Sequence, residues 1–380
     1  MSIYAFAEIE DGKARRIYAS ARYPSKQIGN IFTDCDHPIS LKYADELPLK
    51  VEGFYSILAF RPSHILISRD VLGGKPLYFD NATLTFSSFK RYFEGEPTEV
   101  LPGEVVKVSY EGEVIDRRRY EFREVFWKMD ADVEELKERI VKSLKNFGRK
   151  IKNACIAFSG GVDSSFLAGL YDLPLLTVTA SKDEREWVEK SARAIGRELE
   201  VYEFDEEVVR DALPKVISAI ETTDKLQVSI ALPIYLCVRF AKELGFSEVV
   251  FGQGADELFG GYKRYEMLSE GELEREMMND VMKIGEKNLV RDNKVAYSLE
   301  MKILTPYLQW EIVRCAISIP VELKVRRDGG VVRKFILREM AEEFIPREIA
   351  YRDKKAIQYS TKTSGILKRI LRGIGSLNSS

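Results

Sequence analysis

The sequence predicts an α/β protein with a β-rich N-terminal domain and a C-terminal domain built on a doubly wound parallel sheet. Three observations support this fold class. Short runs of β-branched and aromatic residues, separated by glycine turns, occupy residues 1 to about 122. At Asp130 the apolar residues change to helical spacing. Beyond it, apolar runs alternate with helical segments, which is typical of parallel strands joined by helices.

Six runs in the N-terminal part have the composition of strands, because β-branched and aromatic side chains pack well on a pleated surface. Turn signals at Asp11-Gly12, Gly73-Gly74 and Glu111-Gly112 separate some of them. The expected strands lie within residues 3–10, 53–60, 64–70, 76–80, 82–88 and 104–115.

The C-terminal part opens with a helix expected over 132–147, where apolar residues recur on one face. The boundary is therefore expected near 123–130, giving domains 1–125 and 126–380. Strands are expected within 154–160, 174–180, 198–204 and 247–254, helices within 164–171, 184–198 and 207–221, and mostly helical structure over 262–350.

Composition excludes several classes of protein. With 58 Lys+Arg and 60 Asp+Glu, the chain is not a histone-like or strongly polyanion-seeking protein. Its 2 histidines cannot build a three-histidine metal site, and its 4 cysteines form no Cys-x-x-Cys pair. No signal peptide is apparent, and the longest apolar run, 228–238, is too short to span a bilayer. We therefore expect a cytoplasmic protein without a membrane segment.

The strongest chemical signal is the segment 159–165, Ser-Gly-Gly-Val-Asp-Ser-Ser, between an expected strand and an expected helix. Backbone N–H groups in such a loop, together with the helix dipole, favour a bound phosphate. The loop lacks the Gly-Lys-Ser/Thr ending of a P-loop, and Asp163 places a carboxylate where a phosphate-bound Mg²⁺ needs one. The alternative is a glycine turn with a serine cap. The candidate phosphate-binding residues are Ser159, Gly160, Gly161, Asp163, Ser164 and Ser165.

This motif resembles the signature of the ATP pyrophosphatases, and a second segment, 252–262 (GQGADELFGGY), resembles a signature of the asparagine synthetase family. The resemblance covers nearly the whole chain. It implies a class B type enzyme with a truncated, glutaminase-like Ntn-hydrolase domain and an ATP pyrophosphatase domain. The other segments that resemble the family are 68–78, 101–103, 299–308, 334–338 and 346–358.

The resemblance also implies roles for single residues. Asp163 and Asp256 would hold Mg²⁺ on the pyrophosphate of ATP, and Gly252 would lie against the nucleotide or substrate. The backbone of Thr177-Val178 would touch adenine, and Lys334 would stabilise the transition states. Each residue also has a structural interpretation: Asp256 and Glu257 as helix caps, Lys334 as part of a solvated helix face, and the segment of Arg352 and Lys354 as a surface connection rather than a phosphate neighbour.

Ser2 departs from the family, which has cysteine at this position of its glutaminase. An N-terminal serine can act as a nucleophile. However, the family's segments for glutamine binding and the oxyanion hole have no counterpart here. We expect that glutaminase activity is lost and that the domain serves as a structural partner.

Gln253 is a second departure, because it replaces the glutamate that is a candidate base for the attacking amine. Glutamine keeps the shape of that side chain but accepts no proton. Ser229, Ala231 and Gln309 also replace polar residues of the family, which indicates that substrate recognition has changed or been lost.

The favoured function is an ATP-dependent, AMP-forming ligase that adenylates aspartate or a related carboxylate and forms an amide with ammonia or another amine. The alternatives are a non-catalytic nucleotide-binding scaffold and a tRNA-modifying enzyme. The only basic cluster, around Lys368, Arg369 and Arg372, is better explained as a solvated helix end, so we expect no nucleic-acid partner. Because the family often pairs subunits, a homodimer is an expectation.

Overall fold

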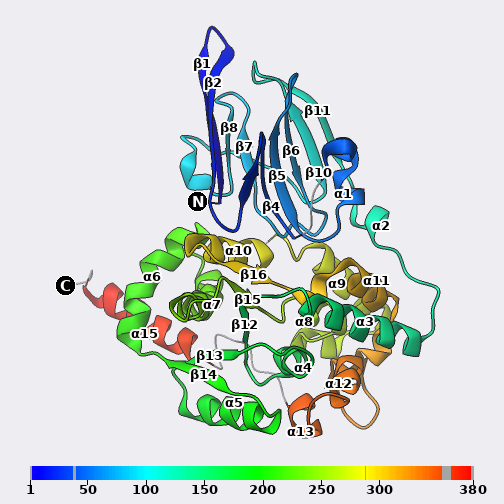
Figure 1. Cartoon of the computed structure of the whole chain (residues 1–380). Coiled ribbons are helices and arrows are strands. Elements are labelled where there is room, and N and C mark those ends of the chain that lie inside the picture. The colour runs from blue at the N-terminus through cyan, green and yellow to red at the C-terminus, as the bar shows by residue number, and fades with distance from the viewer. Residues whose placement is uncertain (1, 37–39, 287, 353–360, 378–380) are drawn as a thin grey trace. The chain divides into compact units, whose positions relative to one another are not determined.

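The computed structural model describes residues 2–36, 40–286, 288–352 and 361–377. The chain forms two compact units. The first contains residues 1–129 and 278–302, and the second contains 130–277 and 303–380. The segment 278–302 thus belongs to the N-terminal unit although it comes from the C-terminal half of the sequence. Figure 1 shows the chain and labels many of its helices and strands.

The first unit contains two antiparallel sheets. One has the order β2-β1-β8-β7-β9 and the other β11-β10-β6-β5-β4-β3. The six expected runs all contain strands. Strands β2, β3, β4 and β9 were not predicted from the sequence. The strands are β1 (Ile3–Glu10), β2 (Lys13–Ala21), β3 (Lys26–Ile28), β4 (Ile31–Cys35), β5 (Tyr55–Phe60), β6 (Ile65–Arg69), β7 (Tyr78–Asp80), β8 (Thr85–Ser87), β9 (Thr98–Glu99), β10 (Glu104–Val108) and β11 (Val114–Arg119).

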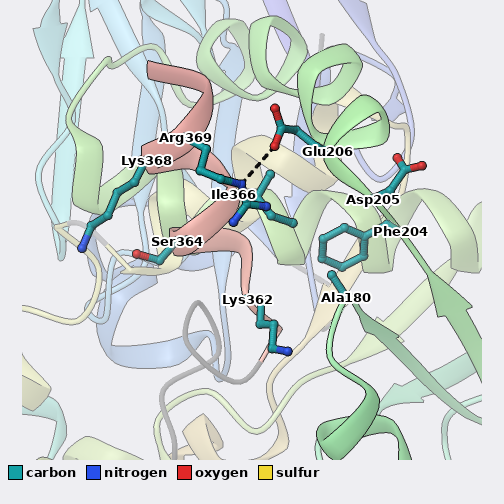
Figure 2. A pocket seen from close by; sticks show the side chains of 10 residues that line it. Ala180, Phe204, Asp205, Glu206, Lys362, Ser364, Ile366, Lys368 and Arg369 are labelled. Carbon is teal, nitrogen blue, oxygen red and sulfur yellow. Dashed lines mark hydrogen bonds and ion pairs between the residues drawn. The ribbon is translucent and has the colours of Figure 1, made fainter. Parts of the chain in front are cut away.

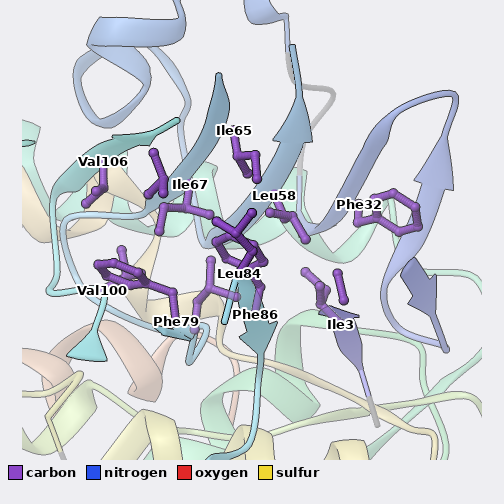
Figure 3. Packing of buried hydrophobic residues seen from close by; sticks show 13 residues of the cluster. Ile3, Phe32, Leu58, Ile65, Ile67, Phe79, Leu84, Phe86, Val100 and Val106 are labelled. Atoms are coloured by element: carbon purple, nitrogen blue, oxygen red, sulfur yellow. The ribbon is translucent and has the colours of Figure 1, made fainter. Parts of the chain in front are cut away.

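The two sheets share one hydrophobic core (Figure 3), which includes Ile3 of β1, Leu58 of β5, Ile67 of β6, Phe79 of β7 and Phe86 of β8. Successive side chains on a strand point to opposite faces. The neighbours of Leu58 on β5 therefore lie in a second core on the other side of the larger sheet, together with the short helix α1 (Leu47–Lys50). Burial on both faces explains why β5 has an apolar rather than an alternating sequence.

Helix α10 (Asn288–Ser298) belongs to the first unit through buried polar contacts. Lys75 Nζ lies 3.1 Å from Asn293 Oδ1 and 3.1 Å from Asp34 Oδ2. The Tyr297 hydroxyl donates to Asp34 Oδ2 over 2.5 Å. Lys75, Asp34 and Tyr297 are each 1% exposed and Asn293 is 4% exposed. These side chains tie the helix to β4 and to the loop before β7.

The second unit contains a sheet with the order β14-β13-β12-β15-β16. β12 pairs in parallel with both β13 and β15, so the strand order reverses at β12. In open parallel sheets, ligands bind at the carboxyl ends of the strands beside such a reversal. The strands are β12 (Ala154–Ala157), β13 (Leu175–Thr179), β14 (Leu199–Glu203), β15 (Glu248–Val250) and β16 (Lys302–Leu304), with a small hairpin of β17 (Val325–Arg326) and β18 (Val332–Arg333).

The expected helices are present. Four helices begin with an Asp or Ser side chain that caps the N-terminus, as these residue types commonly do. Asp132, Ser181, Asp205 and Asp224 accept hydrogen bonds from backbone N–H groups three residues ahead. The helices are α2 (Phe122–Val125), α3 (Val133–Gly148), α4 (Val162–Leu170), α5 (Lys182–Ala194), α6 (Glu206–Ile220), α7 (Lys225–Glu243), α8 (Ala255–Phe259), α9 (Glu270–Met282), α11 (Trp310–Ser318), α12 (Phe335–Glu342), α13 (Arg347–Ala350) and α15 (Thr363–Leu377). Among the residues described, no helix combines the length and apolar character needed to cross a membrane.

Candidate functional site

The candidate phosphate loop connects β12 to α4, as the sequence predicts. The loop is closed by its own serines: Ser159 N donates to Ser164 Oγ over 3.1 Å, and Gly161 N lies 3.4 Å from Ser159 Oγ. Ser165 is different, because its side chain is 0% exposed and its hydroxyl has no hydrogen-bond partner among the residues described. Ser159 and Ser164 therefore line the loop, whereas Ser165 lies beneath it.

Gly160 has a left-handed backbone, with φ of 63°, which favours glycine. A Cβ atom at this position would also lie 2.6 Å from Nε1 of Trp187 on α5. The Trp187 indole donates a hydrogen bond to the Gly160 carbonyl over 3.1 Å. Glycine at 160 is thus required by both the backbone conformation and the close approach of Trp187.

Arg352 contacts the peptide between Ser159 and Gly160. Its guanidinium lies 3.3 Å from the Ser159 carbonyl oxygen, forms an ion pair with Glu184 at 3.0 Å, and lies 4.3 Å from the centre of the Trp187 ring. In a trans peptide the N–H points away from the C=O. Arg352 holds the carbonyl of Ser159 and Trp187 holds the carbonyl of Gly160. The N–H groups of the same two peptides, those of Gly160 and Gly161, therefore point away from Arg352 and Trp187. Nothing in the sequence had indicated Trp187 or Glu184. Lys354 lies outside the residues described.

Three charged residues expected at the site converge. Lys334 Nζ lies 2.5 Å from Asp163 Oδ1, 2.6 Å from Asp163 Oδ2 and 2.7 Å from Asp256 Oδ1. The Lys334 side chain is 1% exposed, whereas the side chains of Asp163 and Asp256 are 19% and 21% exposed. Lys334 therefore does not lie on a solvated helix face, and its ammonium forms the centre of a carboxylate pair.

Two glycines make room for this pair. A Cβ atom on Gly252 would lie 2.8 Å from Asp163 Cβ. A Cβ atom on Gly261 would overlap Asp256 Oδ1 and Lys334 Cε. Gly252 therefore packs against Asp163, and Gly261 packs directly beneath the ion pair.

Two tyrosines donate hydrogen bonds to groups beside the charged centre, the backbone of Asp163 and the side chain of Glu257. The Tyr307 hydroxyl donates to the Asp163 carbonyl over 2.9 Å, and the Tyr262 hydroxyl donates to Glu257 Oε1 over 2.5 Å. Burial raises the pKa of both phenols, and the nearby carboxylates Asp163 and Glu257 add to the rise. Both hydroxyls therefore remain protonated donors at neutral pH.

The helix that carries Asp256 and Glu257 is not capped by either side chain. Its N-cap is Gly254, which has φ of 90° and no side-chain cap hydrogen bond. The two carboxylates bond instead to Lys334 and Tyr262. The interpretation of these residues as helix caps was wrong.

Lys334 itself has an unusual backbone. It is the N-cap of α12 with φ of 57° and ψ of 32°, a left-handed conformation that is uncommon outside glycine. Arg338, one turn later, donates to the carbonyls of Arg333 at 2.7 Å and Arg352 at 3.1 Å. Arg338 thus connects the backbone beside Lys334 to the residue that holds the phosphate loop.

The remaining predicted residues lie around this centre. Gln253 is half-buried immediately before Gly254. Thr177 and Val178 are 8% and 5% exposed, so a ligand at the end of β13 would meet mainly their backbone. Ser229 and Ala231 are buried within α7.

A cavity of about 550 Å³ lies at the carboxyl ends of β13 and β14 (Figure 2). Ala180 and Phe204 line it from the strand ends, and Ser364 and Ile366 line it from α15. On its rim, Arg369 forms an ion pair with Glu206 at 3.1 Å. The side chain of Arg372 lies outside the part of the chain that is described.

Asp163 and Asp256 fit a site for Mg²⁺, because this ion is usually bound by one or two carboxylates together with substrate phosphates. Their oxygens already converge on one cation, the Lys334 ammonium. In the described residues there is no group of three or more His, Cys, Asp or Glu side chains that could hold a metal ion.

In the first unit, Ser2 is 1% exposed and its hydroxyl is bonded to the hydroxyl of Ser25. The Tyr297 hydroxyl, which donates to Asp34, also accepts a hydrogen bond from Ser2. The candidate nucleophile is therefore enclosed by polar side chains of its own unit.

Comparisons with known proteins place this site in a family. The sequence model of the asparagine synthase family matches residues 135–272 and 266–379. A protein from Methanocaldococcus jannaschii that is named as a putative glutamine-hydrolysing asparagine synthetase is 28% identical, over 94% of this chain and 78% of its own length. A glutamine-hydrolysing asparagine synthetase from Triphysaria versicolor is 27% identical, over 85% of this chain and 61% of its own length. The chain thus spans less than two thirds of that plant relative.

Solved structures with a related arrangement are distant. An NH₃-dependent NAD synthetase from Campylobacter jejuni has a TM-score of 0.25 and 15% identity, over 43% of this chain and 78% of its own. An NMN synthetase from Francisella tularensis has a TM-score of 0.26 and 12% identity, over 60% of this chain and 98% of its own. Similarity at this level carries no argument about function. The family match covers most of the second unit, including the candidate phosphate loop and the residues of the charged centre, and the chain belongs to the asparagine synthase family.

Proposed function

We propose that the chain is an ATP-dependent ligase that converts a carboxylate, aspartate or a relative, into an acyl-adenylate and then into an amide with ammonia or another amine. The observation that carries this proposal is the position of Lys334. Its ammonium is buried between the carboxylates of Asp163 and Asp256, and Asp163 lies in the phosphate loop. A cation beside bound phosphates stabilises a reaction that concentrates negative charge.

In the first step, a carboxylate oxygen attacks the α-phosphorus of ATP, the bond to the bridging oxygen breaks, and pyrophosphate leaves with the electron pair. The N–H groups of the phosphate loop bind the leaving pyrophosphate, and Trp187 and Arg352 hold their orientation. Lys334 stabilises the charge that develops at the α-phosphate. Mg²⁺, held by Asp163 and Asp256, supplies neutralising charge on the pyrophosphate oxygens when bound.

In the second step, the amine nitrogen attacks the acyl carbon, the bond to the phosphate oxygen breaks, and AMP leaves. The amine must lose a proton, and Gln253 cannot accept it because an amide side chain is not basic. We infer that the amine reaches the site already neutral or that water removes the proton. The cavity beside Ala180 and Phe204 suits the adenine ring, because it adjoins the end of β13.

We also propose that the first unit is a truncated Ntn-hydrolase-like domain without glutaminase activity. Two facing antiparallel sheets support the fold, and the enclosure of Ser2 by Ser25 and Tyr297 supports the loss of activity. Because Ser2 is only 1% exposed, its hydroxyl is shielded from a substrate.

ATP–pyrophosphate exchange tests the adenylation step. We expect Mg²⁺-dependent exchange with aspartate or another acid from a panel of small carboxylates, and AMP with an amide when ammonium is added. Glutamine should not replace ammonium, and Ser2→Ala should leave ammonium-dependent activity unchanged. Absence of exchange with every acid, while ATP still binds, would favour the non-catalytic scaffold. Glutamine-dependent activity that disappears in Ser2→Ala would refute the loss of glutaminase activity.

A further inference from the structure

The ammonium of Lys334 lies where the two candidate metal-binding carboxylates meet. It is within 2.6 Å of both oxygens of Asp163 and 2.7 Å from Asp256 Oδ1. A lysine ammonium has three hydrogens to donate, so it can satisfy this set of carboxylate oxygens. The lysine is 1% exposed, but the two carboxylates are each about one fifth exposed and remain accessible from solvent.

A divalent cation and this ammonium compete for the same carboxylates. Mg²⁺ requires oxygens at about 2.0–2.1 Å and would need carboxylate oxygens that Lys334 now contacts. Two like charges a few ångströms apart repel each other strongly in a partly buried site. The divalent ion and the ammonium therefore cannot both sit between Asp163 and Asp256.

We propose that Lys334 is a resident cation that holds Asp163 and Asp256 together in the free enzyme, and that the divalent ion arriving with the nucleotide displaces its ammonium. The displaced ammonium then becomes available to the reacting phosphate. The role of the displaced Lys334 ammonium at the reacting phosphate rests on the proposed function. The exchange of cations at Asp163 and Asp256 does not, because it is tested without turnover.

The backbone around Lys334 suits such an exchange. Phe335 N donates to the Lys324 carbonyl and Arg338 N donates to the Lys334 carbonyl, each over 2.9 Å, so the main chain is fixed on both sides. The side chain has four flexible carbons, and its Cε passes over Gly261, where no Cβ restricts it. The ammonium can therefore move while the backbone stays in place.

This arrangement predicts that metal and nucleotide bind cooperatively. A metal ion that binds alone must separate an ammonium from two carboxylates and leave it without a partner in a buried site. When nucleotide is present, its phosphates provide a new anionic partner for the ammonium. The free enzyme should consequently bind divalent cations weakly, and nucleotide should strengthen that binding.

The test is binding of Mn²⁺ alone, measured by the loss of the free-ion signal in electron paramagnetic resonance without nucleotide. Lys334→Met removes the competing charge and should bind Mn²⁺ at least tenfold more tightly than the wild type. Lys334→Arg keeps a cation and should bind Mn²⁺ no more tightly than the wild type. Adding Asp256→Asn to Lys334→Met should remove the gain, because it removes one of the two carboxylates.

An Mn²⁺ affinity of folded Lys334→Met that equals or falls below that of the wild type would overturn the proposal. If Lys334→Met does not fold, Lys334→Gln provides the same test, and Mn²⁺ should raise the melting temperature of that variant more than it raises that of the wild type. An equal rise would also overturn the proposal. Tighter Mn²⁺ binding in the variants would support the cation exchange even if the wild type shows no adenylation. Absence of adenylation would then refute the proposed function alone.

Discussion

The indole N–H of Trp187 donates a hydrogen bond to the carbonyl of Gly160 over 3.1 Å, so a side chain of α5 fixes a peptide of the phosphate loop. One such hydrogen bond contributes about 1 kcal/mol, or roughly a fivefold change in affinity. We expect Trp187→Phe to keep the contact with Arg352 but to bind pyrophosphate about fivefold more weakly.

Isothermal titration with pyrophosphate measures this effect. Trp127→Phe is the matched control, because Trp127 is 55% exposed and lies in the other unit. It should bind pyrophosphate like the wild type. Unchanged pyrophosphate affinity in Trp187→Phe would show that the indole does not orient the loop.

Gly261→Ala places a methyl group against Asp256 and Lys334, where no space exists. Overpacking of this kind costs about 1–3 kcal/mol, and it should also disturb the charged centre. We expect a lower melting temperature together with loss of ATP–pyrophosphate exchange. Gly271→Ala is the control, because a Cβ there meets no atom within 4 Å. A Gly261→Ala variant with wild-type stability and activity would contradict the packing described.

Tyr297→Phe removes the hydroxyl that donates to Asp34, whose Oδ1 already has no hydrogen-bond partner in the described residues. A buried acceptor that loses a donor costs about 1–3 kcal/mol. Urea unfolding should show this loss in Tyr297→Phe. Tyr18→Phe should have little effect, because Tyr18 is 38% exposed and bonds to Glu8 on the surface. Equal stabilities of the two variants would exclude a stabilising role for the buried network.

Asp70 makes stability depend on pH. Burial raises the pKa of this carboxyl from 3.8 to about 6, although Arg69 and the backbone N–H groups of Gly74 and Tyr55 oppose the rise. The folded state therefore binds the proton more tightly than the unfolded state. Stability from this group is fully present below about pH 4 and falls as the pH rises through about 6, by about 3 kcal/mol.

Asp70→Asn isolates this contribution, because asparagine does not titrate and still accepts one hydrogen bond. The free energy of unfolding of the wild type minus that of Asp70→Asn should decrease between pH 4 and pH 7. A difference that stays constant over this range would show that Asp70 ionises normally in the folded protein.

The parallel sheet of the second unit could be predicted because its apolar strands and capped helices alternate along the chain. Helix α7 was missed: it is buried over most of its length and contains Pro233, so it shows neither a polar face nor an uninterrupted helical sequence. The attachment of α10 to the first unit was also missed. Its Asn293 and Lys294 suggest a solvated surface, and only their partners in the folded chain, Lys75 and Tyr78, explain their burial.

In the candidate site, the position of the candidate phosphate loop between β12 and α4 could be predicted from a local motif, whereas its contact with Trp187 could not. Its partner is a backbone carbonyl, which every residue has, so no pattern in the sequence indicates the contact. Lys334 and Asp256 were predicted as separate residues. Their direct ion pair arises only because the segment before α12 folds against the start of α8.

The most direct test of the proposed reaction is the fate of the carboxylate oxygen. The acid that supports exchange is labelled with ¹⁸O in its carboxylate and converted to the amide with ammonium, and the products are analysed by mass spectrometry. Attack on the α-phosphorus predicts that one ¹⁸O appears in AMP and none in pyrophosphate. Label in inorganic phosphate or pyrophosphate, or AMP without label, would contradict an acyl-adenylate.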